Sequence, residues 1–445
     1  MNAAQSRGWL AYGVLGMPLA MVALPLYVTA PRFYNHEFGL ALALTGAAIL
    51  VARLFDTVQD PLLGRWLDRR PAHATAARWG GALLMPLGLL ALFAPPALPG
   101  PALAVWLCLS LVAIALGHSL ITLPYLALAG RLAADASASD RFNASREGFG
   151  LLGVLLASAT LPAVLQAGPH WQAPALLLLG LLLLAGVLLL PRQAGSGEDS
   201  SRQSGKELVE KSGVWPTDPT LIKFLAIYLV NALSAALPAT LAPFFIADVL
   251  AAEAWTGPLL ALYFLAAVLL LSLWVRLAAR FGRLRVWLAG MLLTVLVFLP
   301  VPWLAAGDVA IFAVICVLSG ALLGADLALP PAMLGALAGR ELLTQRYGWW
   351  SLCGKLALAL AVGVSLPLLQ LLGYSSSAKT GLLALAICYA ALPCTMKLLA
   401  AALLWRWQSA LAAADGGDHA GGGEIAGAGP ANGNHGRNPL TGATS

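Results

Sequence analysis

Residues 47–70 read AAILVARLFDTVQDPLLGRWLDRR, a stretch in which apolar residues surround Arg53, Asp56 and Asp60. Apolar runs of this length recur along the whole chain, and of its 445 residues 60% are hydrophobic and only 10% are charged. A soluble domain has about 25% charged residues, and a helix needs about 20 apolar residues to cross a bilayer. The composition therefore excludes a soluble globular protein and predicts an all-α polytopic membrane protein.

Breaks between the apolar runs divide the chain into twelve predicted spans. They lie near residues 9–30, 39–67, 77–95, 100–131, 142–166, 173–191, 220–247, 255–280, 284–304, 309–338, 345–373 and 379–407. A polar stretch after the sixth span predicts an N-terminal six-helix bundle, a cytoplasmic linker, a C-terminal six-helix bundle and a disordered cytoplasmic tail. Their expected bounds are 1–191, 192–219, 220–407 and 408–445.

Proline positions suggest that the second half repeats the first. Leu123-Pro124 in the fourth span corresponds to Leu329-Pro330 in the tenth, although prolines are common in membrane helices and can also align by chance. An even number of spans in each half keeps the two repeats parallel. Two parallel, pseudo-symmetric six-helix bundles with a substrate site between them resemble the major facilitator fold.

Positive charges indicate the orientation in the membrane. Arg and Lys residues concentrate in every second turn between the spans, as at Arg69-Arg70, Arg131 and Arg283, while the opposite turns contain only Arg32 and Lys379. Cytoplasmic loops are enriched in Lys and Arg. We therefore expect a multi-pass protein of the cell inner membrane with both termini in the cytoplasm.

The second span contains the clearest candidate site. An ionised side chain near the bilayer centre costs about 3 kcal/mol, and at about 100° per residue Arg53, Asp56 and Asp60 share one helix face. Two carboxylates one turn apart can hold a sodium ion or share a proton. We assign Asp56 and Asp60 to cation coupling; the alternative is a structural ion cluster that ties helices together.

Four further polar side chains within spans are candidates for the substrate cavity. Asp326 precedes Pro330-Pro331, which are expected to interrupt the helix, so we expect Asp326 to line the central cavity. Lys355 is the deepest cation of the second half, and we expect it to approach the two carboxylates across the interface. Arg146 could instead snorkel to the headgroups, and His118 could be a hydrogen-bonded core histidine rather than a proton relay.

A second group lies at the cytoplasmic end of the second span. Gly64, Asp68, Arg69 and Arg70 are candidates for a gate latch, and solvated positive-inside charge is the alternative. The chain has no P-loop, no H-E-x-x-H and no nucleophile elbow, so we expect neither ATP-driven transport nor enzymatic hydrolysis. Its five cysteines form no C-x-x-C pair, and no metal site is predicted.

The second-span motif, Arg53-Leu-Phe-Asp56-x-x-x-Asp60-Pro61-Leu-x-Gly64-x-x-x-Asp68, resembles the signature of the glycoside-pentoside-hexuronide:cation symporters, the melibiose carrier group of the major facilitator superfamily. Leu123-Pro124-Tyr125 and Gly354-Lys355 add to the resemblance. It implies that Asp56 and Asp60 are the coupling acids, that Lys355 faces them, and that the two halves rock. Gln59, Ser119 and Thr122 are further candidates for the cation site, and Arg53 and Tyr125 are further candidates for the substrate cavity.

Two departures from this family concern the substrate. Pro18 and Thr122 stand where similar melibiose carriers place sugar-binding acids, which argues against a melibiose-like substrate. Gln59 replaces an asparagine, which weakens the case for sodium over protons. We predict a monomeric symporter that uses H+ or Na+, has no cofactor or nucleic-acid partner, and imports a sugar, glycoside or related organic solute. The alternatives are a lysolipid or amphiphile translocator of the same fold and a non-transporting membrane scaffold.

Overall fold

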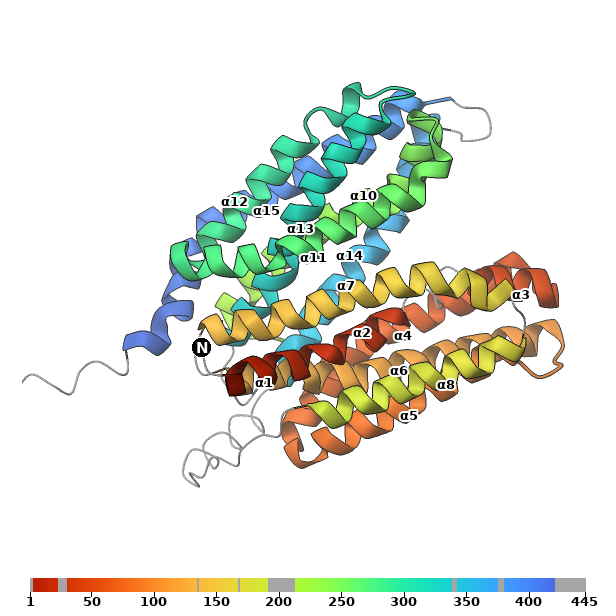
Figure 1. Cartoon of the computed structure of the whole chain (residues 1–445), viewed down its shortest axis with the longest axis horizontal. Helices are drawn as coiled ribbons and strands as arrows, with labels where there is room; N and C mark the ends of the chain where they lie inside the picture. The colour runs from red at the N-terminus through yellow and green to blue at the C-terminus, as the bar shows by residue number, and fades with distance from the viewer. Residues whose placement is uncertain are drawn as a thin grey trace, which may run out of the picture.

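The computed structural model of the chain describes residues 3–22, 30–133, 136–166, 169–190, 213–337, 342–374 and 380–420. Figure 1 shows two groups of helices side by side, one formed by α1 to α8 and the other by α10 to α15. Within the described residues, eight helices are long and apolar enough to cross a membrane. The predicted all-helical membrane fold is confirmed.

The N-terminal half begins with a divided helix. Its helices are α1 (Ala3–Val14), α2 (Gly16–Met21), α3 (Ala30–Phe38), α4 (Leu42–Arg69), α5 (Ala74–Phe93), α6 (Gly100–Leu132), α7 (Ala136–Gln166) and α8 (Pro169–Leu189), with a 3-10 turn at Pro71–His73. The first predicted span is not one continuous helix. Pro18 has no N–H to donate to the carbonyl of Val14, and α1 ends at that residue.

The C-terminal half is built from longer helices. They are α10 (Pro219–Phe244), which continues as a π-helix (Phe245–Val249), α11 (Thr256–Phe281), α12 (Arg283–Phe298), α13 (Val309–Leu337), α14 (Leu343–Leu371) and α15 (Leu382–Ala420), with 3-10 turns at Glu253–Trp255 and Val301–Trp303. Gly282 has a φ of 87°, a conformation that glycine adopts without strain. It therefore provides the tight turn between α11 and α12.

Two predicted features of this half differ from the structure. Pro330-Pro331 do not interrupt α13; the segment from Ala328 to Leu334 is buried on all sides, so packing holds its helical shape despite the missing N–H donors. The tail, predicted to be disordered from residue 408, is helical up to Ala420, in keeping with its alanine-rich sequence. Residues 192–212 of the predicted linker and residues 421–445 of the predicted tail lie outside the described residues.

The two halves meet through α4 and α14, and through α7 with α11 and α13. The helices come very close at Gly64, where an added Cβ atom would lie 2.5 Å from the carbonyl oxygen of Thr344. In Figure 1 the two groups diverge away from the end that carries the N-terminus and the C-terminal end of α15. The α4–α14 contact places the carboxylates of the second predicted span directly against the other half.

Candidate ion-coupling site

The two predicted coupling acids lie one turn apart in α4. Asp60 is 1% exposed and Asp56 is 9% exposed, and both face the region where α4 packs on α6 and α14. A carboxylate this deeply buried is stable as an anion only with nearby cations or hydrogen-bond donors. The neighbouring helices supply both.

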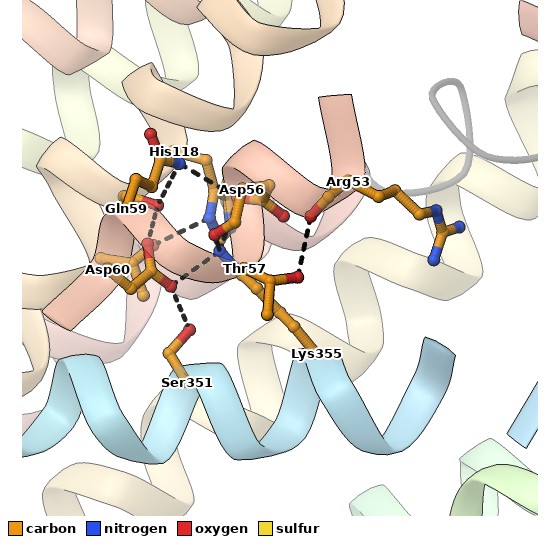
Figure 2. Close-up of polar contacts among 10 residues, drawn as sticks. Arg53, Asp56, Thr57, Gln59, Asp60, His118, Ser351 and Lys355 are labelled. Carbon is orange, nitrogen blue, oxygen red and sulfur yellow. Dashed lines mark hydrogen bonds and ion pairs between the residues drawn. The ribbon is translucent and has the colours of Figure 1, made fainter. Parts of the chain in front are cut away.

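Lys355 of α14 provides the cation. Its Nζ lies 2.5 Å from Asp56 Oδ1 and 2.7 Å from Asp60 Oδ2, and it donates to the main-chain carbonyl of Asp56 at 3.0 Å. Figure 2 shows the ammonium reaching from α14 to both carboxylates. The predicted approach of Lys355 across the interface is confirmed. Two carboxylates and one ammonium leave this group one negative charge in excess.

Hydroxyl groups from two helices complete the surroundings of Asp60. Ser119 of α6 donates to Asp60 Oδ1 at 2.6 Å, and Ser351 of α14 donates to Asp60 Oδ2 at 2.6 Å. Hydrogen bonds to a charged acceptor are about twice as strong as neutral ones. Ser351 was not among the predicted site residues, although it precedes Lys355 by four positions and so shares its helix face.

The amide group of Gln59 links Asp56 to Ser119, the hydroxyl group that donates to Asp60. Its Nε2 donates to Asp56 Oδ1 at 3.1 Å and to Ser119 Oγ at 3.3 Å. Its Oε1 is buried and has no hydrogen-bond partner among the described residues. An unsatisfied buried carbonyl oxygen is uncommon in folded proteins, and this one could accept a donor or a cation at the site.

Asp68 belongs to the predicted gate latch at the end of α4. It accepts hydrogen bonds from the main-chain amides of Thr344 at 3.2 Å and Gln345 at 2.7 Å, at the start of α14. Arg131 of α6 approaches the same carboxylate at 3.4 Å. A carboxylate at a helix N-terminus satisfies free N–H groups and the helix dipole. The structure thus brings Asp68, together with Gly64, into the contact between the halves.

The other two predicted gate residues lie outside this contact. Arg69 and Arg70 are exposed, and the guanidinium of Arg70 lies 5.7 Å from the ring centre of Trp66. Their position at the end of α4 is the one that solvated positive-inside charge would occupy.

Comparisons with known proteins agree with the fold. The sequence model of a family described as MFS/sugar transport protein matches residues 7–408. The chain belongs to this family of major facilitator transporters. It is therefore a multi-pass membrane protein.

Two curated relatives of this transporter from Escherichia coli strain K12 are named symporters. One, the putative glycoside/cation symporter YagG, is 29% identical over 23% of this chain and 23% of its own length. The other, the inner membrane symporter YicJ, is 28% identical over 23% of this chain and 23% of its own length. The chain thus matches about a quarter of the length of each.

A solved structure supports the fold alone. A bacterial homologue of the iron transporter ferroportin, in an outward-facing state, superposes with a TM-score of 0.67, with 17% identity, over 91% of this chain and 99% of the other. This likeness is too distant in sequence to carry a function.

Three predicted residues lie around the coupling site without a direct bond to its acids. The side chain of Arg53 points away from the carboxylates in Figure 2, and Thr57 Oγ1 donates to its carbonyl at 2.8 Å. His118 lies beside the cluster (Figure 2), and its Nδ1 is 3.4 Å from Thr122 Oγ1. The counter-ion of the two acids is therefore Lys355; the long Arg53 side chain extends outward from the shared helix face.

Tyr125 and Arg146 have local partners in the N-terminal half. Tyr125 Oη donates to the carbonyl of Tyr12 at 2.7 Å, and Tyr12 Oη donates to the carbonyl of Tyr125 at 3.0 Å. This reciprocal pair is fully buried and ties α1 to α6. Arg146 forms an ion pair with the adjacent Glu147 of α7.

Asp326 lies inside the C-terminal half rather than between the halves. Its Oδ2 is 2.5 Å from Lys397 Nζ, and its Oδ1 accepts from Asn231 Nδ2 at 3.0 Å and from Trp287 Nε1 at 2.9 Å. All three partners belong to this half. Lys397 was not predicted, although a lysine in the middle of the last apolar span meets the same criterion that selected Lys355.

Proposed function

We propose that the protein is a cation-coupled symporter that imports a small polar solute across the inner membrane by alternating access. The observation that carries this proposal is the position of Lys355. Its ammonium belongs to one half of the molecule, and the two acids that it binds belong to the other. An ion that competes for these acids would also change how the halves hold together.

The charge of the cluster favours one monovalent cation. The excess negative charge is buried, where an uncompensated charge is costly. A sodium ion or a proton would neutralise it. The ammonium already lies between Asp56 and Asp60, so an arriving cation shares their oxygens with Lys355 and weakens its attraction to each of them. Cation binding thereby loosens α14 from α4, which links ion occupancy to movement.

The available ligands suit either coupling ion. For sodium, the oxygens of Asp56, Asp60, Gln59 and Ser119 form a set of hard ligands from two helices. For a proton, the two carboxylates can share one charge because close like charges favour protonation of one of them. Uptake driven by separate sodium and proton gradients distinguishes the two ions.

The arrangement of the halves supports a state that is closed toward the termini. Gly64 and Asp68 of α4 contact Thr344 and Gln345 at the start of α14. With both termini in the cytoplasm, these contacts close the cytoplasmic side and leave the solute path to the opposite side. Return to the inward-facing state then requires Asp68 to release the two amides of α14.

The proposed substrate is a sugar, a glycoside or a related organic solute. The name of the relative that is called a glycoside/cation symporter supports this class. Pro18 is buried in α2 and Thr122 is neutral, so neither can provide the carboxylate that a melibiose carrier uses at the corresponding position. His118 and Thr122 offer neutral hydrogen-bonding groups beside the ion site, which suits hydroxyl groups.

Uptake into proteoliposomes tests the proposal. Sodium and proton gradients are imposed separately while labelled sugars, glycosides and carboxylates are screened. We expect one gradient to drive accumulation, and we expect Asp56→Asn to abolish that accumulation. Glu253→Gln, an exposed acid at the start of the segment before α11, is the matched control and should transport normally. Accumulation that depends on neither gradient, or that survives in Asp56→Asn, would reject the proposed coupling.

A further inference from the structure

A cavity of about 210 Å³ lies inside the C-terminal half, away from the coupling site. All of its lining residues fall between 234 and 397, on α10, α11, α12, α13 and α15. Most of the wall is apolar or aromatic, and its aromatic rings are Tyr263, Phe264, Phe298, Phe312 and Tyr389. Such a space, mostly apolar with a few polar groups, is typical of small-molecule sites.

The ion pair of Asp326 and Lys397 closes one end of this cavity. Along α13 the lining runs from Phe312 to Asp326, and along α15 it runs from Tyr389 to Lys397, so both charges come last. The side chains are 13% and 4% exposed, respectively. The pair is therefore almost completely removed from solvent, yet it borders open space.

A purely structural role does not account for this combination. Well-packed apolar residues hold helices together as well as a buried ion pair does, and open space beside buried atoms sacrifices packing contacts. A site for a ligand explains both the space and the charges.

The geometry points to a ligand with an aromatic or aliphatic body and an uncharged head that accepts hydrogen bonds; we propose this cavity as its binding site. Asp326 and Lys397 neutralise each other, so a charged head would introduce a net charge into an apolar environment. The ammonium of Lys397 has three N–H donors. One of them donates to Asp326. The head would accept from the remaining donors.

The size of the cavity limits the body of the ligand. A volume of about 210 Å³ lies below the roughly 300–1,000 Å³ of pockets for drug-sized ligands. That is room for a single ring with a short side chain and excludes a two-chain lipid. This proposal is independent of the coupling mechanism. The coupling residues belong to α4, α6 and α14, whereas the cavity is lined by α10, α11, α12, α13 and α15.

Two cysteines in the wall, Cys316 and Cys394, allow a direct test on the purified full-length protein. The rate of modification of Cys394 by N-ethylmaleimide is measured by peptide mass spectrometry with 2-phenylethanol, phenylacetate or phenethylammonium present. These three compounds share a phenyl body and differ in the charge of the head. We expect 2-phenylethanol to slow the reaction at least about fivefold at saturation, and the two ions to slow it much less.

Cys108 of α6 serves as the internal control, since it is similarly half-buried but lies in the N-terminal half. Its rate should not change. Ala239→Leu, which places a larger side chain in the cavity wall, should remove the protection. The double variant Asp326→Asn with Lys397→Met keeps the site neutral but removes the ammonium donors, so it should weaken the protection by 2-phenylethanol without favouring either ion. Asp56→Asn should leave the protection intact.

Several results would overturn the proposal. Equal slowing at Cys108 and Cys394 would mean general partitioning of the compound into the protein. Stronger protection by phenylacetate or phenethylammonium would contradict the uncharged head. Absence of any reaction at Cys394 would mean that small molecules do not reach the cavity, and unchanged protection in Ala239→Leu would place the binding elsewhere.

Discussion

A Cβ atom on Gly348 of α14 would lie 2.5 Å from the carbonyl oxygen of Asp60 in α4. Only glycine therefore allows these two helices, which belong to opposite halves, to touch through their main chains. The side chain of the same Asp60 binds Ser351 and Lys355, which follow Gly348 along α14. The main-chain contact and the ion cluster thus share one short segment of the interface.

Gly348→Ala should separate α4 from α14. Overpacking of this kind costs about 1–3 kcal/mol. That cost corresponds to a shift of roughly 5- to 150-fold in the equilibrium between the state in which α4 and α14 are in contact and the state in which they are apart. Spin labels at His73 and Arg285, which are exposed near the end where the halves meet, should report a larger distance. Gly363→Ala on the same helix has open space around the new methyl group and should leave the distance unchanged. Identical distances in wild type and Gly348→Ala would contradict the role assigned to this contact.

Loss of the Asp68 carboxylate should expose the start of α14. Removing an acceptor at a helix N-terminus costs about 0.5–2 kcal/mol. In Asp68→Ala we therefore expect hydrogen exchange of the Thr344 and Gln345 amides to accelerate by roughly 2- to 30-fold, and in Asp68→Asn, which keeps one acceptor oxygen, by less. Asp308→Ala is a suitable control because Asp308 accepts from the amide of Ala305 in an exposed turn. Unchanged exchange in Asp68→Ala would show that this contact opens independently of Asp68.

Replacing Lys355 should strengthen binding of the coupling ion. If the ammonium competes with the cation for Asp56 and Asp60, Lys355→Met removes the competitor. The apparent ion affinity should then rise at least about tenfold, or ~1.4 kcal/mol, while net uptake falls because the ion is not released. For a proton, the same effect appears as a shift of the pH dependence toward higher pH. Calorimetric titration at several pH values measures it, and weaker binding in the variant would contradict competition.

The sequence predicted the positions of the helices better than it predicted how the helices pack against one another. Apolar runs between polar breaks gave the helix positions because the bilayer imposes a minimum length on each span. Pro330-Pro331 were expected to break α13, since the rule for proline refers to an isolated helix, whereas the burial of this segment in the bundle holds it helical. Local rules describe single helices, and tertiary packing overrides them.

In the candidate site too, the residues could be selected from the sequence, but not all of their contacts could. Asp56, Asp60 and Lys355 could be selected as charges within apolar spans, and the structure brings them together. The direction in which Asp326 points could not be predicted, because it depends on which neighbouring helix carries its counter-ion. The ion pair of Arg283 could not be predicted either. The positive-inside rule explains an arginine in a cytoplasmic turn as a solvated charge, so it gives no reason to expect a buried partner.

Arg283 at the start of α12 and Asp140 in α7 form an ion pair of 2.8 Å between the halves, with side chains 4% and 2% exposed. Removing one member of a buried pair typically costs about 3–5 kcal/mol, while replacing both by apolar residues is often neutral. We therefore expect Asp140→Leu and Arg283→Met each to lower the thermal stability and to weaken closure at this end. The double variant should recover much of the loss.

A double-mutant cycle shows whether Asp140 and Arg283 stabilise the closed state as a pair or contribute to stability separately. A coupling energy above about 1 kcal/mol, outside the ~0.5 kcal/mol scatter of independent sites, supports a direct contact that holds the halves together. The spin-label distance should change in both single variants and return toward the wild-type value in the double variant. Arg141→Met is the control on the same turn of α7, because Arg141 bonds locally to Ser137 and its loss should leave the distance unchanged. Strictly additive losses in stability, with no recovery of the distance, would show that Asp140 and Arg283 do not act as a pair.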